Sequence, residues 1–95
     1  LFNLVYSNYV LQFIKNKGTF IETCYMNLRK NGWLFLHTFS KNDIIFKDKG
    51  VDENKLKNLL KKTHFKNISI CEFKIYDYEP GHNHLHNILE ITAQK

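Results

Sequence analysis

Residues 33 to 39 constrain the fold of this chain more than any other segment. Their sequence is Trp-Leu-Phe-Leu-His-Thr-Phe, and the first four residues carry no polar side chain. A strand without polar alternation is typical of a parallel sheet, because helices there cover both faces. Parallel strands need crossover connections, which are right-handed in about 98% of cases. The segment therefore predicts a central strand of an α/β sheet.

The residues before this strand predict the start of such a crossover. Residues 2–7 form a short apolar run rich in strand formers, and residues 9–16 place apolar side chains at helical spacing. We expect Gly18 to end that helix. Thr19 followed by Glu22 forms a capping box and predicts that a second helix begins there.

This second helix has one apolar stripe and a glycine after it. Gly32 is expected to end the helix, since glycine adopts the left-handed C-cap without steric cost. The spacing of the apolar side chains is i, i+3, i+4 and i+7, which places them on one face: Ile21, Cys24, Tyr25 and Leu28. That face is wide enough to lie on a sheet.

The middle of the chain predicts an exposed loop and a third helix. Residues 40–50 are mostly polar, but the apolar residues 44–46 interrupt them, either as a lid over a pocket or as core filling under the loop. Asp52 can cap the next helix. The apolar stripe of that helix is Leu56, Leu59 and Leu60.

The last third predicts an antiparallel hairpin. Apolar and polar residues alternate along the first strand, with a phase slip near Cys71 and Glu72 that suggests a bulge. Residues 78–81 are turn-like, and residues 85–93 form the second strand. The expected order is β-α-α-β-α-β-β, an α/β fold that begins parallel and ends antiparallel.

Length and charge narrow the classes of protein further. A chain of 95 residues has room for a single domain, residues 1–95. The net charge is +5, but the lysines are spread along the chain rather than clustered with aromatic residues, so nucleic-acid binding is not expected. No apolar run reaches the roughly 20 residues that a membrane helix needs. We expect a cytoplasmic protein in which Cys24 and Cys71 are reduced.

This order of elements resembles the C-terminal half of class I S-adenosylmethionine-dependent methyltransferases, which have a Rossmann-like sheet. Three segments carry the resemblance. Residues 2–14 resemble the fourth strand and its following helix, and Leu28-Arg-Lys-Asn-Gly-Trp-Leu-Phe-Leu36 resembles the start of the fifth strand. Residues 79–91 resemble the closing hairpin of small-molecule-type members. The resemblance implies methyl transfer from S-adenosylmethionine to an undetermined, small-molecule acceptor.

One departure from the family pattern is large. The glycine-rich turn and the acidic residue that hold the cofactor in this family are missing, as are the N-terminal strands. We therefore expect part of a longer chain, inactive alone, that binds S-adenosylmethionine only together with an N-terminal half. Residues 2–7 would then form an exposed sheet edge, available to a second copy or to that half.

The resemblance implies cofactor contacts at the end of the first strand. Ser7 and Asn8 end that strand at its carboxyl edge, and Tyr9 and Gln12 follow on the next turn. Asn8 has a second interpretation, because asparagine is also a good helix cap.

Histidines and a threonine are the candidate substrate contacts. His37 and Thr38 lie where the second strand ends, and a histidine there can orient a substrate or accept a proton. His82, His84 and His86 alternate along an extended segment, so their side chains share one face. Hydrogen-bonding roles within the fold remain the alternative for all five residues.

The three alternating histidines also fit a different function. Imidazoles on one face, with Asp77 or Glu79, form a plausible ligand set for zinc, iron, nickel or copper. Two alternatives to a methyltransferase fragment therefore stay open. One is a metal-binding module that uses His82, His84 and His86, and the other is a non-catalytic interaction or oligomerisation domain.

Overall fold

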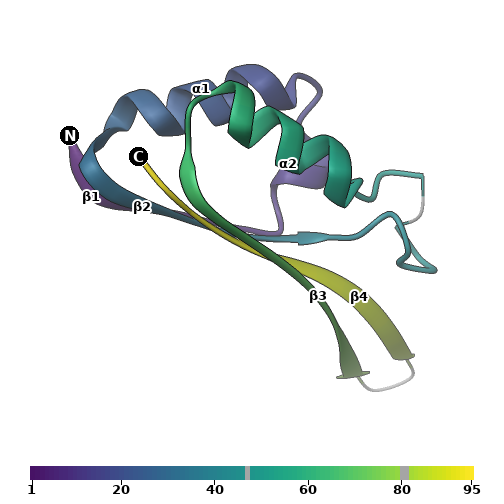
Figure 1. The fold of residues 1–95 in the computed structure, drawn as a ribbon. Helices are drawn as coiled ribbons and strands as arrows, with labels where there is room; N and C mark the ends of the chain where they lie inside the picture. The colour runs from purple at the N-terminus through teal and green to yellow at the C-terminus, as the bar shows by residue number, and fades with distance from the viewer. Residues whose placement is uncertain (47, 80–81) are drawn as a thin grey trace.

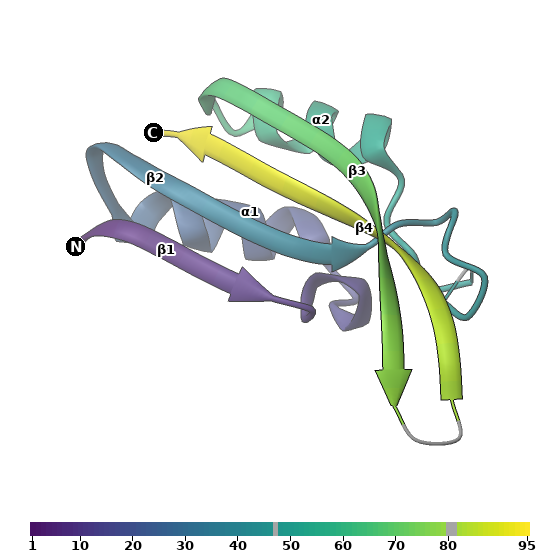
Figure 2. The same cartoon turned by 90° about the horizontal axis from the view of Figure 1, so that it is seen from below.

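The computed structural model describes residues 1–46, 48–79 and 82–95, with backbone alone for residues 78, 79, 82 and 83. Four strands form one sheet in the order β1-β2-β4-β3, in which β1 and β2 are parallel and the other pairs antiparallel (Figure 1, Figure 2). The elements are β1 (Phe2–Asn8), η1 (Leu11–Phe13), α1 (Lys17–Asn27), β2 (Leu28–Phe39), α2 (Glu53–Lys62), β3 (Lys66–Glu79) and β4 (His82–Gln94). The predicted α/β class and hairpin finish are confirmed, although the first helix is only the short 3₁₀ turn η1.

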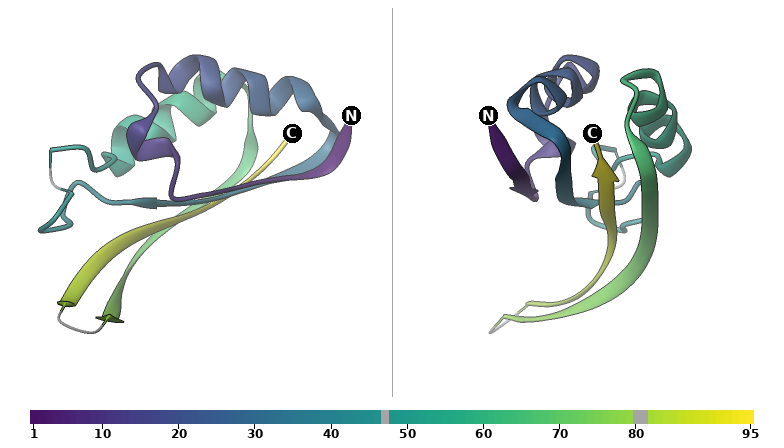
Figure 3. Two further views of the ribbon diagram at one scale, coloured as in Figure 1. Left: turned by 180° about the vertical axis from the view of Figure 1, so that it is seen from behind. Right: turned by 60° about the vertical axis from the view of Figure 1, so that its left-hand side comes forward.

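Both helices lie on the same face of the sheet (Figure 3). Along β2, Leu34, Leu36 and Thr38 point under the helices and are fully buried, whereas Trp33 and His37 on alternate positions are not. The expectation that this strand is buried on both faces is therefore wrong for the described residues. The helices that these residues form cover only one face.

The uncovered face is apolar near β1. Leu4 and Tyr6 are 58% and 55% exposed, and they pair in register with Trp33 and Phe35 of β2. Within the described residues β1 has a strand neighbour on one side only, so it forms an edge of the sheet, as expected.

Helix α1 begins earlier than the capping box predicts. Asn16 is its N-cap, and the side-chain oxygen of Asn16 accepts a hydrogen bond from the Thr19 backbone N–H at 3.0 Å. Gly18 therefore lies in the first turn of α1 and does not end a helix. The apolar stripe is confirmed, since Ile21, Cys24 and Leu28 are buried and Tyr25 packs against the core.

Gly32 has a different role from the predicted helix end. Helix α1 ends at Asn27, and the left-handed residue nearby is Asn31, with φ of 67°. A Cβ at Gly32 would lie 2.9 Å from the Arg29 carbonyl oxygen and 3.0 Å from that of Asn3. Glycine is needed here because the backbones of β1 and β2 approach closely.

The middle of the chain folds largely as predicted. Asp52 caps α2 by accepting a hydrogen bond from the Lys55 N–H at 3.1 Å, and it also forms an ion pair with Lys41 at 2.7 Å. No described helix is long and apolar enough to span a membrane. Cys24 and Cys71 are free thiols, as expected.

The hairpin pairs continuously from Ser69 to Glu79, so the bulge predicted at Cys71 and Glu72 is wrong. The register shift lies between Lys66 and Ser69, where Asn67 has a positive φ of 51°. The alternation of apolar and polar residues along β3 changes for another reason. The start of β3 and the end of β4 pack under the helices, whereas the ends that join the two strands extend beyond them (Figure 2).

Candidate functional site

The carboxyl ends of β1 and β2 meet at Tyr9. Its backbone N–H donates to the His37 carbonyl at 2.7 Å, and its φ is 58°. The Tyr9 ring stacks on Phe39, with 5.1 Å between ring centroids. Tyr9 is thus held against the end of β2, and burial raises the pKa of its phenol.

Gln12 and Thr38 are bonded to each other beneath this edge. The Thr38 hydroxyl donates to Gln12 Oε1 at 2.6 Å, and Gln12 Nε2 donates to the Tyr9 carbonyl at 2.6 Å. Both residues are buried. Their polar groups therefore hold η1 against β2, and their predicted ligand contacts stay predictions.

The other residues predicted at this edge have different surroundings. Ser7 is half-buried and Asn8 is exposed. Asn8 is not a helix cap, because the N-caps of η1 and α1 are Val10 and Asn16. His37 lies on the uncovered face and makes a 3.0 Å hydrogen bond through Nε2 to Glu90.

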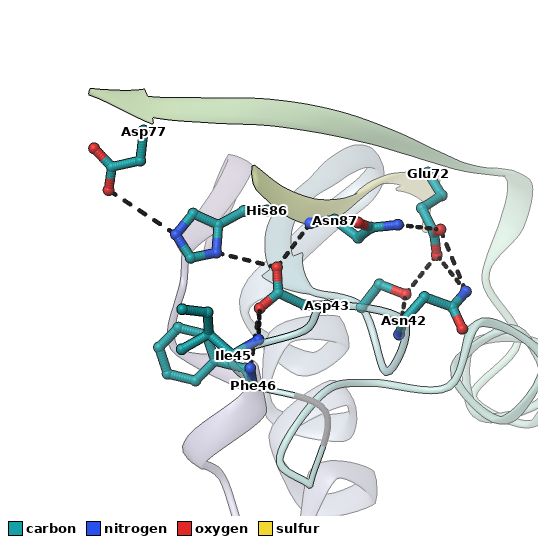
Figure 4. Close-up of polar contacts among 9 residues, drawn as sticks. Asn42, Asp43, Ile45, Phe46, Glu72, Asp77, His86 and Asn87 are labelled. Carbon is teal, nitrogen blue, oxygen red and sulfur yellow. Dashed lines mark hydrogen bonds and ion pairs between the residues drawn. The ribbon is translucent and has the colours of Figure 1, made fainter. Parts of the chain in front are cut away.

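A buried carboxylate, Asp43, organises the loop beside β4. It is 0% exposed, and its Oδ2 accepts hydrogen bonds from the backbone N–H groups of Ile45 at 3.1 Å and Phe46 at 3.0 Å. Its Oδ1 accepts from the Asn87 N–H at 2.7 Å and lies 3.0 Å from His86 Nδ1 (Figure 4). Asp43 thus joins the 44–46 loop to the hairpin.

The same contact fixes the tautomer of His86. An ionised carboxylate has no hydrogen to donate, so the proton between the two groups is on His86 Nδ1. In the neutral imidazole, Nε2 then carries the lone pair. It faces Asp77, whose Oδ2 lies 3.9 Å away (Figure 4).

A pocket of about 210 Å³ lies beside this histidine. Its lining residues come from the ends of β1 and β2 and from the hairpin: Tyr9, Phe39, Ile75, Tyr76, Asp77, His86 and Ile88. Phe46 of the 44–46 segment stacks on Phe39 at 4.3 Å between ring centroids, so this segment packs behind the pocket wall. Ile44 and Ile45 remain 77% and 49% exposed.

A second acidic residue, Glu72, attaches the same loop to β3. It accepts hydrogen bonds from the Ser40 hydroxyl and from the side-chain amides of Asn42 and Asn87, the latter at 3.1 Å (Figure 4). Burial raises the pKa of Glu72, but these hydrogen bonds together outweigh it and leave the pKa below its usual value. The loop is therefore held by two carboxylates, one from the loop and one from the hairpin.

The predicted histidine row is only partly described. The ring centroids of His84 and His86 lie 6.0 Å apart, and the His82 side chain lies outside the described residues. Among the side chains that are described, no group of three His, Cys, Asp or Glu residues is arranged to hold a metal ion. His82 is one of the three ligands of the metal-binding alternative and is not among these side chains, so that alternative stays a prediction.

Comparisons with known proteins agree on the fold. No protein-family model matches the chain, and no curated protein matches it in sequence. A phosphoethanolamine N-methyltransferase from Haemonchus contortus, solved with S-adenosyl-L-methionine, superposes with a TM-score of 0.77 at 14% identity, over 99% of this chain and 33% of that one.

Two further structures give the same result. A methyltransferase from Thermotoga maritima, described as a possible histamine N-methyltransferase, matches with a TM-score of 0.74 at 12% identity, over 99% of this chain and 56% of that one. A methyltransferase from Archaeoglobus fulgidus matches with 0.74 at 11% identity, over 98% and 59%. The chain spans less than two thirds of each of these proteins, and it has the fold of part of an S-adenosylmethionine-dependent methyltransferase.

Proposed function

We propose that this chain is the acceptor-binding part of an S-adenosylmethionine-dependent methyltransferase that acts on a small molecule. The pocket at Tyr9 and Phe39 carries the proposal. Ligands of open α/β sheets bind at the carboxyl ends of the strands. Tyr9 follows β1 directly and Phe39 ends β2, so the pocket lies at that position.

The residues present do not complete a site for the cofactor. Such a site needs glycines that let the backbone approach the ligand and a carboxylate for the ribose hydroxyls. The glycines that the structure describes lie in α1, at the β1–β2 contact and beside Ser40. Gln12, expected at the cofactor, already bonds Thr38 and Tyr9. Activity and cofactor binding are therefore assigned to a larger assembly.

The uncovered face of the sheet has the character of an interface with a further portion of protein. Leu4, Tyr6 and Trp33 are 58%, 55% and 40% exposed, and an apolar patch of this kind marks an interaction surface. Among the described residues, the side of β1 away from β2 has no strand partner, so its backbone groups are open along the same border. We assign this surface to an N-terminal methyltransferase portion that also supplies the cofactor site.

Calorimetry tests the proposal with two forms of the protein. One form is the 95-residue chain, and the other extends it with the coding sequence upstream of Leu1. The extended form is expected to bind S-adenosylhomocysteine with a dissociation constant on the order of micromolar, whereas the 95 residues alone bind none. Tight binding by the 95 residues, or none by the extended form, would contradict the proposal.

A size measurement separates the oligomerisation alternative. Stable dimers of the 95 residues, together with an extended form that ignores the cofactor, would instead indicate a non-catalytic oligomerisation domain. A Tyr6→Lys variant serves as the matched control, because it places a charge on the exposed face of β1 and would disrupt such a dimer.

A further inference from the structure

The described wall of the pocket combines aromatic side chains with one carboxylate. Tyr9, Phe39 and His86 present rings to one another, with 5.1 Å between the Tyr9 and Phe39 centroids and 5.1 Å between those of Phe39 and His86. Asp77, with its side chain 39% exposed, adds a carboxylate, and none of the lining residues described is Lys or Arg.

Two hydrogen-bond acceptors face each other in this pocket. His86 Nδ1 is occupied by Asp43, so in the neutral ring Nε2 presents a lone pair, and Asp77 Oδ2 lies 3.9 Å from Nε2. That separation is too long for a direct hydrogen bond. It suits a donor nitrogen lying between them, because a single nitrogen can be about 2.8 Å from both acceptors. An ammonium group carries enough hydrogens to bond both.

We propose that this pocket binds a small primary or secondary amine in its protonated form, with Asp77 as the counter-ion and His86 as the proton acceptor. The proposal rests on the proposed function, because it names the acceptor class of the same site. Asp43 is a positioning residue. It holds the ring of His86 and bonds the 44–46 loop that packs behind Phe39.

The proton transfer balances without a further reactant. An N–H bond of the ammonium breaks, its electron pair stays on nitrogen, and the proton forms a bond with His86 Nε2. The amine becomes neutral and nucleophilic, as methyl acceptance requires. The positive charge passes to the imidazole, where Asp43 stabilises it from 3.0 Å.

Nuclear magnetic resonance titration with benzylamine and benzyl alcohol tests the assignment. The two probes share a ring and differ in charge. Benzylamine is expected to shift the amide signals of Ile75 and Asp77 and to bind about tenfold more tightly than benzyl alcohol. Asp77→Asn should remove that preference while leaving the alcohol unaffected, and the exposed Glu22→Gln on α1 should change neither.

A second measurement addresses His86 without any ligand. Long-range nitrogen correlation spectra should show a protonated Nδ1 and an unprotonated Nε2 in the free protein, and His86→Gln should weaken benzylamine binding. Equal binding of the two probes, an unchanged preference in Asp77→Asn, or a protonated Nε2 would overturn the inference. None of these measurements needs cofactor, so an extended protein that binds S-adenosylhomocysteine but ignores benzylamine overturns this inference and leaves the proposed function intact.

Discussion

Asparagine in place of Asp43 is the most informative single change, because it preserves shape and removes charge. Both oxygens of the carboxylate are occupied, Oδ2 by the N–H groups of Ile45 and Phe46 and Oδ1 by those of Asn87 and His86. An amide keeps one oxygen, so two of these four donors would face an NH₂ group instead. Each lost hydrogen bond to a charged group is worth roughly 1.5–3 kcal/mol. Since the loop can relax, we expect a loss of about 3 kcal/mol in the free energy of unfolding.

Urea unfolding followed by circular dichroism measures this loss. For a domain of this size the slope is about 1 kcal/mol/M, so the midpoint should fall by about 3 M, or the variant should be largely unfolded. Asp48→Asn is the matched control, because Asp48 belongs to the same loop and is exposed. A loss below about 1 kcal/mol for Asp43→Asn would show that the four contacts do not hold the loop.

Four further changes test other parts of the fold by the same unfolding assay. Thr38→Val should cost about 1–2 kcal/mol, because it leaves the buried oxygen of Gln12 without its donor; an unchanged midpoint would refute that role. The hydrogen-bonded ion pair with Lys41 lowers the pKa of Asp52 in the folded protein. The stabilisation that Asp52 gives is therefore fully present above its unfolded-state pKa of about 4 and is lost as the pH falls through the lower folded-state pKa. Asp52→Asn should therefore be less stable than the parent chain at pH 6, with a smaller difference at pH 2.5. Gly50→Ala should destabilise strongly, since its Cβ would meet the Ser40 carbonyl oxygen at 2.2 Å, whereas Gly18→Ala has room and should be neutral or stabilising by up to about 1 kcal/mol.

The order of elements was predictable because it depends on local pattern. Apolar runs, helical stripes and the alternating hairpin are each contained in one short segment, and all of them formed except the helix over residues 9–16, where only η1 lies. The boundaries were less predictable. The N-cap of α1 is Asn16 rather than Thr19. The side-chain oxygen of Asn16 accepts from the Thr19 N–H, which in the predicted capping box would donate to Glu22. The local pattern predicts a helix end at Gly32, but its small size instead allows close contact with the β1 backbone at Asn3, 29 residues earlier.

The site depends on contacts that no local pattern contains. Gln12 and Thr38 are polar residues near strand ends, and their hydrogen bond to each other spans 26 residues. Asp43 was missed for the same reason, since its bond to His86 spans 43 residues. The turn that Asp43 forms could be predicted from the sequence, because an aspartate commonly accepts hydrogen bonds from the second and third following N–H groups. The ligand contacts expected of Ser7, Asn8, His37 and His84 stay predictions.

The pocket and the exposed apolar side chains of β1 lie on the same face of the sheet. Phe39, Ile75, Asp77 and His86 occupy strand positions on the face that α1 and α2 leave uncovered, the same face as Phe35. A face that met only water would alternate toward polar residues, as one-sided antiparallel sheets do. On β1 and β2 apolar side chains continue on both faces, so these two strands suit coverage from both sides, whereas β4 carries Glu90 and Thr92 on this face. Any body that covers the second face lies beside the open side of the pocket, and shielding from water would strengthen the attraction between Asp77 and a bound ammonium. The exposed apolar side chains of β1 and the pocket beside Tyr9 lie on the same face of the sheet, so a partner that covered β1 would also shield the pocket.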